Sequence, residues 1–167
     1  MCFGGGMQIA LGADIRIVTP TCKLSIMEAK WGLIPDMSAS ITLRELIPID
    51  IAKELTFTGR IINGVEAKEI GLVTKCVTNS ADNTNEENDF AMKEALILAN
   101  EIVKQSPDAI AAAKMMYQKT RVDTNEEQCL ILESKLQKQL IPSWNQFVAS
   151  AKNFGVSFSY TKTKDLE

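Results

Sequence analysis

Histidine is absent from the sequence, and this absence excludes more kinds of active site than any other feature of the chain. Without an imidazole the protein cannot build a Ser-His or Cys-His nucleophilic pair, or the usual zinc sites that depend on histidine ligands. A general acid or base must therefore be an aspartate, glutamate, lysine, tyrosine or cysteine. We expect the site to hold no metal ion.

Cysteine pairs at metal-binding spacing are missing as well. The four cysteines are Cys2, Cys22, Cys76 and Cys129, and no two of them form a C-x-x-C pair. Neither a zinc knuckle nor a disulfide framework is therefore indicated. Because no histidine is present to activate them, we expect the thiols to be small buried side chains in a reducing compartment, and we predict a cytoplasmic protein.

Long apolar runs and clusters of basic residues are also absent. No stretch approaches the ~18 apolar residues of a membrane helix, and residues 1–11 contain three consecutive glycines and carry no charged leader segment. The formal net charge of −3, without a cluster of lysine and arginine, gives a phosphate backbone no continuous basic face to follow. The sequence therefore predicts neither a membrane protein nor a nucleic-acid partner.

Apolar residues make up 46% of the 167-residue chain, which is enough for a folded globular domain. Periodicity predicts short strands at residues 14–18, 23–26 and 72–77. Helices are predicted at residues 7–11, in two segments from residue 38 onward separated by Pro48, and at 64–70, 89–105, 107–119, 125–140 and 143–154. Residues 27–37 and 79–88 are predicted as loops, and the segment after residue 154 as a frayed tail.

The first candidate site feature is the run Gly4-Gly5-Gly6 ahead of the first short helix. Consecutive glycines let a backbone approach a ligand closely, and free amides at a helix N-terminus carry a partial positive charge that suits a developing oxyanion. An ordinary tight turn is the alternative interpretation.

Two carboxylates follow within the loop at residues 27–37. Glu28 lies among apolar residues, so its carboxylate is either half buried, as suits acid/base work, or solvated and paired with Lys30. Asp36 comes directly before the next helix, and capping that helix is its alternative role.

Taken together, these segments resemble the enoyl-CoA hydratase/isomerase (crotonase) superfamily. Residues 4–16, GGGMQIALGADIR, are similar to its glycine-rich oxyanion segment and the strand that follows. Residues 28–35, EAKWGLIP, are similar to its P-E-x-x-x-G-x-x-P loop, with Met27 in place of the proline. Residues 55–60, 66–73 and 106–114 match later motifs of the family in the same order.

The resemblance implies an α/β fold, the crotonase-like (ClpP/crotonase) spiral of stacked ββα turns. Residues 1–90 would form the C-terminal part of the spiral core, and residues 91–167 a helical region at a trimer interface. The resemblance also implies a homotrimer or dimer of trimers, and a preceding portion, outside this sequence, with an A-x-A-G-x-D segment that supplies the first oxyanion amide. Three short strands make a weak sheet, which likewise points to further strands upstream.

By the same resemblance, Glu28 and Asp36 are the catalytic residues and Gly5 supplies an oxyanion amide. The substrate would be an acyl-CoA thioester, with no cofactor beyond the coenzyme A of the substrate itself. The residues expected to contact it are Gly4, Gly6, Gln8, Met27 and Trp31. Packing is the alternative role for the methionines, Met37 included, and for Trp31.

Two positions depart from the family's hydratases, which carry a glutamate at the Gln8 position and another at the Glu28 position. The neutral amide of Gln8 argues against hydration, which needs a water activated and a proton delivered. Dienoyl-CoA isomerases resemble this chain in pairing a glutamate with an aspartate eight residues later, which is the position of Asp36. They often carry an aspartate at the Gln8 position too, and this chain does not.

The sequence therefore predicts an enzyme of the dienoyl-CoA isomerase type, acting in fatty-acid metabolism through an oxyanion-stabilised enolate. An enoyl-CoA hydratase is one alternative, and a 3,2-enoyl-CoA isomerase that needs only Glu28 is another. A third is a non-catalytic acyl-CoA-binding paralogue, because Gln8 is neutral and only one oxyanion amide can be assigned within this chain.

Overall fold

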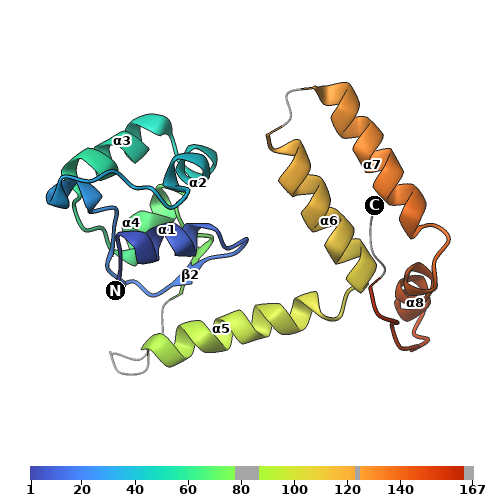
Figure 1. Ribbon diagram of the computed structural model, residues 1–167. Helices are drawn as coiled ribbons and strands as arrows, with labels where there is room; N and C mark the ends of the chain where they lie inside the picture. Colours follow the sequence, from blue (N-terminus) through green and yellow to red (C-terminus); the bar gives the residue numbers. More distant parts are fainter. Residues whose placement is uncertain (78–86, 123–124, 164–167) are drawn as a thin grey trace. The chain divides into compact units, whose positions relative to one another are not determined.

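The computed structural model describes residues 1–77, 87–122 and 125–163 (Figure 1). The chain forms two compact units, Met1–Leu96 and Ile97–Glu167. The boundary falls within helix α5 (Glu87–Ile102). A division of roles between residues 1–90 and 91–167 stays a prediction, and the loop predicted at 79–88 lies outside the described residues except for its last two, which open α5.

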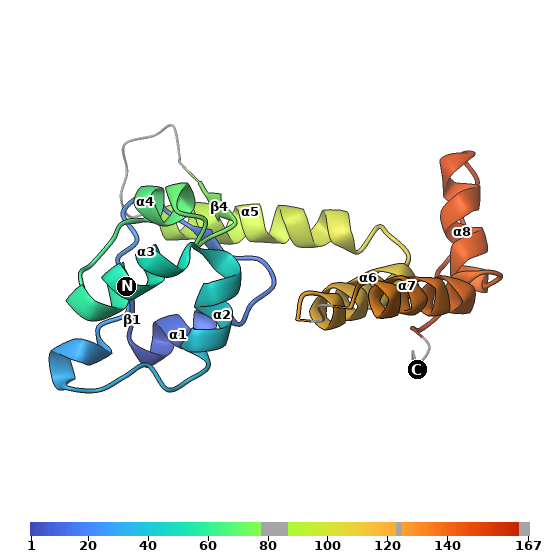
Figure 2. The same ribbon diagram turned by 90° about the horizontal axis from the view of Figure 1, so that it is seen from above.

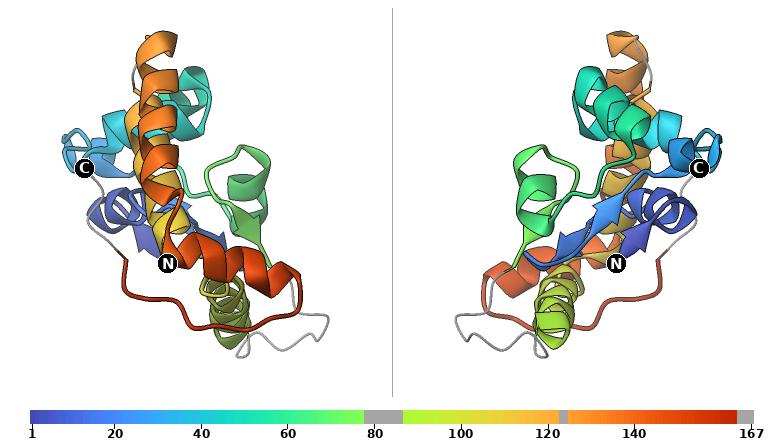
Figure 3. Two further views of the ribbon diagram at one scale, coloured as in Figure 1. Left: turned by 90° about the vertical axis from the view of Figure 1, so that its right-hand side faces the viewer. Right: turned by 90° about the vertical axis from the view of Figure 1, so that its left-hand side faces the viewer.

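Two pairs of short parallel strands organise the first unit. Strand β1 (Cys2–Phe3) pairs with β3 (Leu24–Ser25), and β2 (Ile17–Val18) pairs with β4 (Lys75–Cys76). The remaining elements of this unit are α1 (Gly5–Leu11), η1 (Glu28–Trp31), α2 (Ala39–Leu46), α3 (Ile49–Thr58) and α4 (Gly64–Glu69). Figure 3 shows β1 running directly into α1.

The predicted strands are found at the right places but are shorter than expected. Residues 14–18, 23–26 and 72–77 each contribute only two residues to a ladder. Ahead of β2 the backbone leaves the ladder geometry, because the Arg16 carbonyl accepts from both Thr74 N and Lys75 N, at 2.9 and 3.1 Å. Strand β1 was not predicted, because two residues are too few to show an alternating pattern.

Helices α1, α2, α3 and α4 all contribute side chains to the core of the first unit. Its buried side chains are Met7, Leu11, Leu24, Ile26, Ala39, Leu43, Ile47, Ala52, Leu55, Ile62, Ala67, Leu72 and Val73. The separation of α2 and α3 at Pro48 is confirmed, as is the helix predicted from Gly64. This core fixes the helices around the two strand pairs.

The segment predicted as a loop at residues 27–37 is partly helical. Its first half forms the 3-10 turn η1, which ends at Gly32 because that residue adopts a left-handed φ of 70°. The Gly32 N–H donates to the carbonyl oxygen of Ala29 at 3.1 Å. The rest of the segment, residues 33–38, is irregular and leads into α2.

Three helices make up the second unit: α6 (Pro107–Thr120), α7 (Glu126–Leu140) and α8 (Trp144–Asn153). Their ends fall within one residue of the predicted ones. The side chains of Asn125 and Ser143 accept from Gln128 N and Gln146 N, which satisfies first-turn amides of α7 and α8. Figures 1 and 2 show α6 and α7 lying side by side.

Residues 155–163 of the tail are docked rather than frayed, so for this described part the prediction is wrong. Asn145 on α8 is 1% exposed, accepts from Thr161 N at 2.8 Å and donates to Asp108 at 2.8 Å. The Phe158 ring also packs against Trp144, with the ring centres 5.9 Å apart. The chain's own tail therefore packs against the aromatic side chains Trp144 and Phe147 of α8.

Among the described residues, none of the helices combines the length and the apolar character required to cross a membrane. A cytoplasmic location stays a prediction.

A first prediction concerns Gly64, where α4 begins under the turn that follows β2. A Cβ at this position would lie 2.0 Å from Thr19 O and 2.9 Å from Thr19 C. Because backbone atoms must move to relieve this clash, we expect Gly64→Ala to destabilise the protein by about 2 kcal/mol or more and to lower Tm by about 5 °C. Gly6→Ala is the matched control, since a Cβ there meets nothing within 4 Å. Equal Tm values for the two variants in thermal unfolding would contradict the packing described.

A second prediction concerns Arg60, which joins the end of α3 to the first turn of α4. Its guanidinium lies 2.7 Å from Glu54 Oε1 and 2.6 Å from Glu66 Oε1. The hydrogen bonds from Arg60 hold the pKa of Glu54 below its ordinary value. The stabilisation is therefore present above the pKa of the unfolded chain and is lost as pH falls through the lower folded value.

Carboxyl-carbon NMR titration checks this pair. In Arg60→Gln the titration midpoint of the Glu54 carboxyl should rise toward the ordinary glutamate pKa, because the ionised carboxylate loses the hydrogen bonds from the guanidinium. Arg44→Gln, an arginine of α2 without an ion pair among the described residues, should leave the midpoint where it is. An unchanged Glu54 midpoint in Arg60→Gln would show that Arg60 does not hold this carboxylate in solution.

Candidate active site

The parallel pairing of β1 with β3 brings the candidate residues together. Cys2 is in register with Leu24 and Phe3 with Ser25, so the chain leaves both strands at the same end of the pair. The carboxyl ends of parallel strands are where α/β proteins commonly place functional side chains. Here the glycine run follows β1, and Glu28 comes shortly after β3.

The three glycines form a helix start rather than a three-residue turn. Gly4 is the N-cap of α1, with a φ of 53° that favours glycine, and its N–H donates to Ser25 O at 3.0 Å. Helix α1 begins at Gly5, so the Gly5 amide belongs to the first turn, where an N–H has no acceptor in its own helix. Gly5 therefore lies at a helix N-terminus, as expected, although the helix begins two residues before the predicted start at Met7. The cleft expected in front of its amide stays a prediction.

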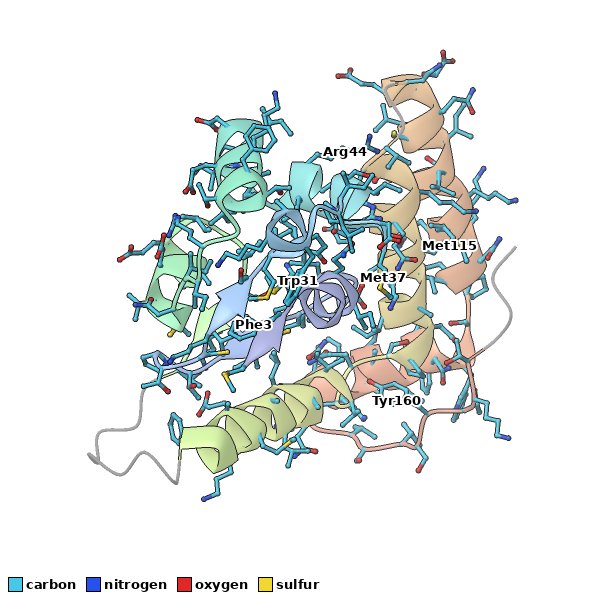
Figure 4. The ribbon with its side chains drawn as sticks, turned by 60° about the vertical axis from the view of Figure 1, so that its left-hand side comes forward. Phe3, Trp31, Met37, Arg44, Met115 and Tyr160 are labelled. Atoms are coloured by element: carbon cyan, nitrogen blue, oxygen red, sulfur yellow. The ribbon has the colours of Figure 1, made fainter. Side chains whose placement is uncertain are left out.

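Met37 lies over the start of α1. A Cβ built on Gly5 would be 3.1 Å from Met37 Sδ, and Figure 4 shows Met37 beside this helix. Gly6 faces open space, since a Cβ there would meet nothing within 4 Å. Packing in the core was the role expected for Met37, but its side chain is 46% exposed. No pattern in the sequence distinguishes it from the buried methionine Met7.

Glu28 is buried, at 8% exposure, and is held by Gln8. Gln8 Nε2 donates to Glu28 Oε1 at 2.6 Å, and Met37 N donates to Gln8 Oε1 at 2.7 Å. Because a backbone N–H only donates, it fixes the carboxamide with its oxygen toward Met37 and its nitrogen toward Glu28. The alternative of a solvated Glu28 paired with Lys30 is therefore wrong.

The second oxygen of Glu28 has no such partner. Glu28 Oε2 is buried, and no donor among the described residues reaches it. Leaving a buried acceptor unsatisfied costs about 1–3 kcal/mol, and proteins tolerate this cost mainly where the group has a functional role. The other oxygen lies next to the glycine run, since a Cβ on Gly4 would be 3.4 Å from Glu28 Oε1. The buried carboxyl and the helix start are thus immediate neighbours.

Asp36 occupies an exposed position beside this network. Helix α2 has Ser38 at its N-cap, so the alternative of Asp36 as the cap is wrong. Its carboxylate is exposed, while the next residue in the chain, Met37, is tied by its N–H to Gln8. The structure therefore anchors the backbone beside Asp36 to the site without burying its side chain.

Two further predicted substrate contacts lie in different environments. Trp31 is 76% exposed, so packing against the described residues does not account for it. Met27 is half-buried against the end of α3, where its Cα lies 3.3 Å from the position of a Cβ on Gly59. Only Gln8, Glu28, Gly4 and Gly5 thus form a contiguous cluster with Met37, and the substrate-binding roles stay predictions.

The thiol of Cys2 lies in the strand that leads into the glycine run. Cys2, in β1, is partly buried, and this burial raises its pKa above the ordinary value, with a smaller contribution from Cys22. Because the thiolate is the nucleophilic form, the environment disfavours covalent catalysis by Cys2. Glu28 is the buried carboxyl of the cluster, and its role in proton transfer stays a prediction.

Comparison with known proteins identifies the family. The sequence model described as Enoyl-CoA hydratase/isomerase matches residues 1–154. The chain belongs to the enoyl-CoA hydratase/isomerase family. The mouse Enoyl-CoA hydratase domain-containing protein 2, mitochondrial, is 38% identical over 112 residues, which are 67% of this chain and 36% of that protein. Human Methylglutaconyl-CoA hydratase, mitochondrial, is 36% identical over 115 residues, or 69% of this chain and 32% of the relative.

Solved structures confirm the crotonase-like α/β fold. The enoyl-CoA hydratase of Mycobacterium tuberculosis H37Rv matches 96% of this chain with a TM-score of 0.83 at 25% identity, and 60% of that chain is covered. A protein of Thermobifida fusca YX in complex with CoA matches 84% of this chain, and 51% of its own, with a TM-score of 0.74 at 26% identity. The chain spans about a third of the length of the curated relatives it matches. An assembly of three or six copies stays a prediction.

Proposed function

We propose that this protein isomerises double bonds in acyl-CoA thioesters, with Glu28 carrying the proton and the Gly5 amide stabilising the enolate oxygen. The observation that carries the proposal is the oriented carboxamide of Gln8, which donates to one oxygen of Glu28 and leaves the other buried and unpaired. A carboxyl in this state is positioned to take up a proton and to return it.

The proton balance of the reaction needs only one such group. Glu28 would remove a proton from the carbon next to the thioester carbonyl, and the electrons would move onto the carbonyl oxygen to form a dienolate. The same carboxyl would return the proton at the far end of the conjugated system, and the double bond would move into conjugation with the thioester. An oxyanion donor at a helix start contributes about 3 kcal/mol or more to such a transition state.

Hydration is the rival reaction, and the names of two relatives support it. One is Methylglutaconyl-CoA hydratase and another is Carnitinyl-CoA dehydratase of Salmonella typhi, 35% identical over 118 residues, so both names specify the addition or loss of water. Adding water needs one group to activate it and another to deliver a proton. The carboxamide of Gln8 does neither, and its orientation is fixed by Met37 N. The neutral amide of Gln8 therefore favours isomerisation over hydration in this chain.

Coenzyme A is proposed as part of the substrate, without a separate cofactor. The structural relative from Thermobifida fusca was solved with CoA, which supports a thioester ligand for this fold. No step in the proton balance above requires a metal or redox group.

Whether Asp36 takes part in proton transfer distinguishes two types of isomerase. Moving a 3,5-diene to a 2,4-diene transfers a proton over several carbons, a span too long for one carboxyl. The exposed carboxylate of Asp36, adjacent to the anchored Met37, is the proposed second proton carrier for this dienoyl type. A 3,2-enoyl shift would use Glu28 alone.

A third prediction tests the pair at the centre of the site. Glu28→Gln should reduce isomerisation by roughly 10²–10⁴-fold with little loss of thioester binding, because the proton carrier is gone while its shape is kept. Gln8→Glu should raise hydration of a 2-enoyl-CoA and lower isomerisation, since two carboxyls so close compete for one proton. Gln137→Glu, at an exposed position of α7, is the control. Full isomerase activity in Glu28→Gln would overturn the proposed mechanism.

A fourth prediction concerns Asp36. If the enzyme is of the dienoyl type, Asp36→Asn should cut isomerisation of a 3,5-dienoyl-CoA by about 10²-fold or more and leave the 3,2-enoyl shift intact. Steady-state kinetics with both substrates checks this. Equal activity of wild type and Asp36→Asn on the diene would contradict a role for Asp36 in the proton transfer. A wild-type protein that binds acyl-CoA but turns over neither substrate would instead be a binding protein.

A further inference from the structure

A groove of about 220 Å³ lies between α2 and α3 in the first unit. Its floor is apolar and buried, with Leu43 and Ala52 at 4% and 5% exposure. Its rim is apolar but open to solvent, with Ile49 and Phe57 at 59% and 74% exposure. Apolar side chains in this arrangement bind a short hydrocarbon segment by removing it from water.

Two cations border the same groove. Arg44 on α2 and Lys53 on α3 both line it, and both are exposed. Figure 4 labels Arg44 on its helix. In the part of the chain that the structure describes, neither side chain forms an ion pair, since the described ion pairs involve Arg60, Lys75 and Lys104. The groove thus combines an apolar wall with two positive charges that the described chain does not neutralise.

The loop at residues 35–37 links the groove to the candidate active site along the chain. Pro35 lines it, and Asp36 and Met37 follow directly in the chain. Met37 in turn covers the Gly5 start of α1 and holds Gln8. A ligand that begins at the Gly5 amide and passes the loop at Pro35 would therefore enter the groove.

We propose that this groove selects acyl chains that end in a second carboxylate, so that the substrates are CoA thioesters of dicarboxylic acids. The inference rests on the proposed acyl-CoA site. A plain hydrocarbon tail would use the apolar wall and leave both cations without a partner, whereas a free phosphate would use the cations and leave the wall exposed. A methylene chain tipped with a carboxylate satisfies both features.

Calorimetry with saturated thioesters, which lack a double bond and are not turned over, tests the proposal. Wild-type protein should bind adipyl-CoA about tenfold more tightly than hexanoyl-CoA, because two exposed cations each contribute a few-fold in affinity. In the double variant Arg44→Gln/Lys53→Gln this preference should disappear, with hexanoyl-CoA binding unchanged. The double variant Lys23→Gln/Lys119→Gln removes the same charge from exposed positions outside the groove and should keep the preference.

Several outcomes would overturn the assignment. Equal affinity of wild type for the two thioesters would do so, as would no binding of either. If Arg44→Gln/Lys53→Gln weakened adipyl-CoA, hexanoyl-CoA and free CoA alike, the cations would hold CoA phosphates instead of an acyl carboxylate. The proposed isomerase function is tested separately. If the protein prefers adipyl-CoA but isomerises no enoyl-CoA, the assignment of the groove holds and the isomerase proposal is wrong.

Discussion

The hydrogen bond from the Gln8 carboxamide to Glu28 Oε1, 2.6 Å long, is the interaction on which the arrangement of the site depends. A buried carboxyl is costly unless something donates to it. Gln8 supplies that donor only because Met37 N occupies its oxygen at 2.7 Å and prevents the amide from turning over. The same contact draws the loop carrying Asp36 against α1. Three segments of the chain are thereby joined around one carboxyl that keeps one oxygen unpaired.

The backbone beneath this network explains why such distant residues meet. Parallel pairing of β1 and β3 delivers Gly4 and Glu28 to the same end of the strand pair, and the Gly4 N–H bonds to Ser25 O at 3.0 Å. With a side chain on Gly4, the positive φ would be strained and a Cβ would lie 3.4 Å from Glu28 Oε1. Glycine is therefore favoured here by the positive φ, and a Cβ would lie in contact with the carboxyl beside it.

The sequence predicted the helices well and the site in part. Helix ends followed from local signals such as Pro48 and Gly64, which act within a few residues. The strands were too short for their periodicity to show, and the docked tail depends on Asn145 contacting Thr161, a long-range contact without a local pattern. The residue types of Glu28, Gln8 and Gly5 indicated a site and its chemistry. The orientation of Gln8 and the place of Met37 could not be predicted, because both depend on tertiary packing.

A crystal structure of the protein with an unreactive enoyl-CoA analogue tests the central claim most directly. The account predicts the thioester oxygen within hydrogen-bond distance of the Gly5 amide. It also predicts the free oxygen of Glu28 within about 3–3.5 Å of the carbon next to the carbonyl, while Gln8 still donates to the other oxygen. A structure in which Glu28 turns away from the acyl group, or in which the thioester oxygen lies away from Gly5, would contradict it.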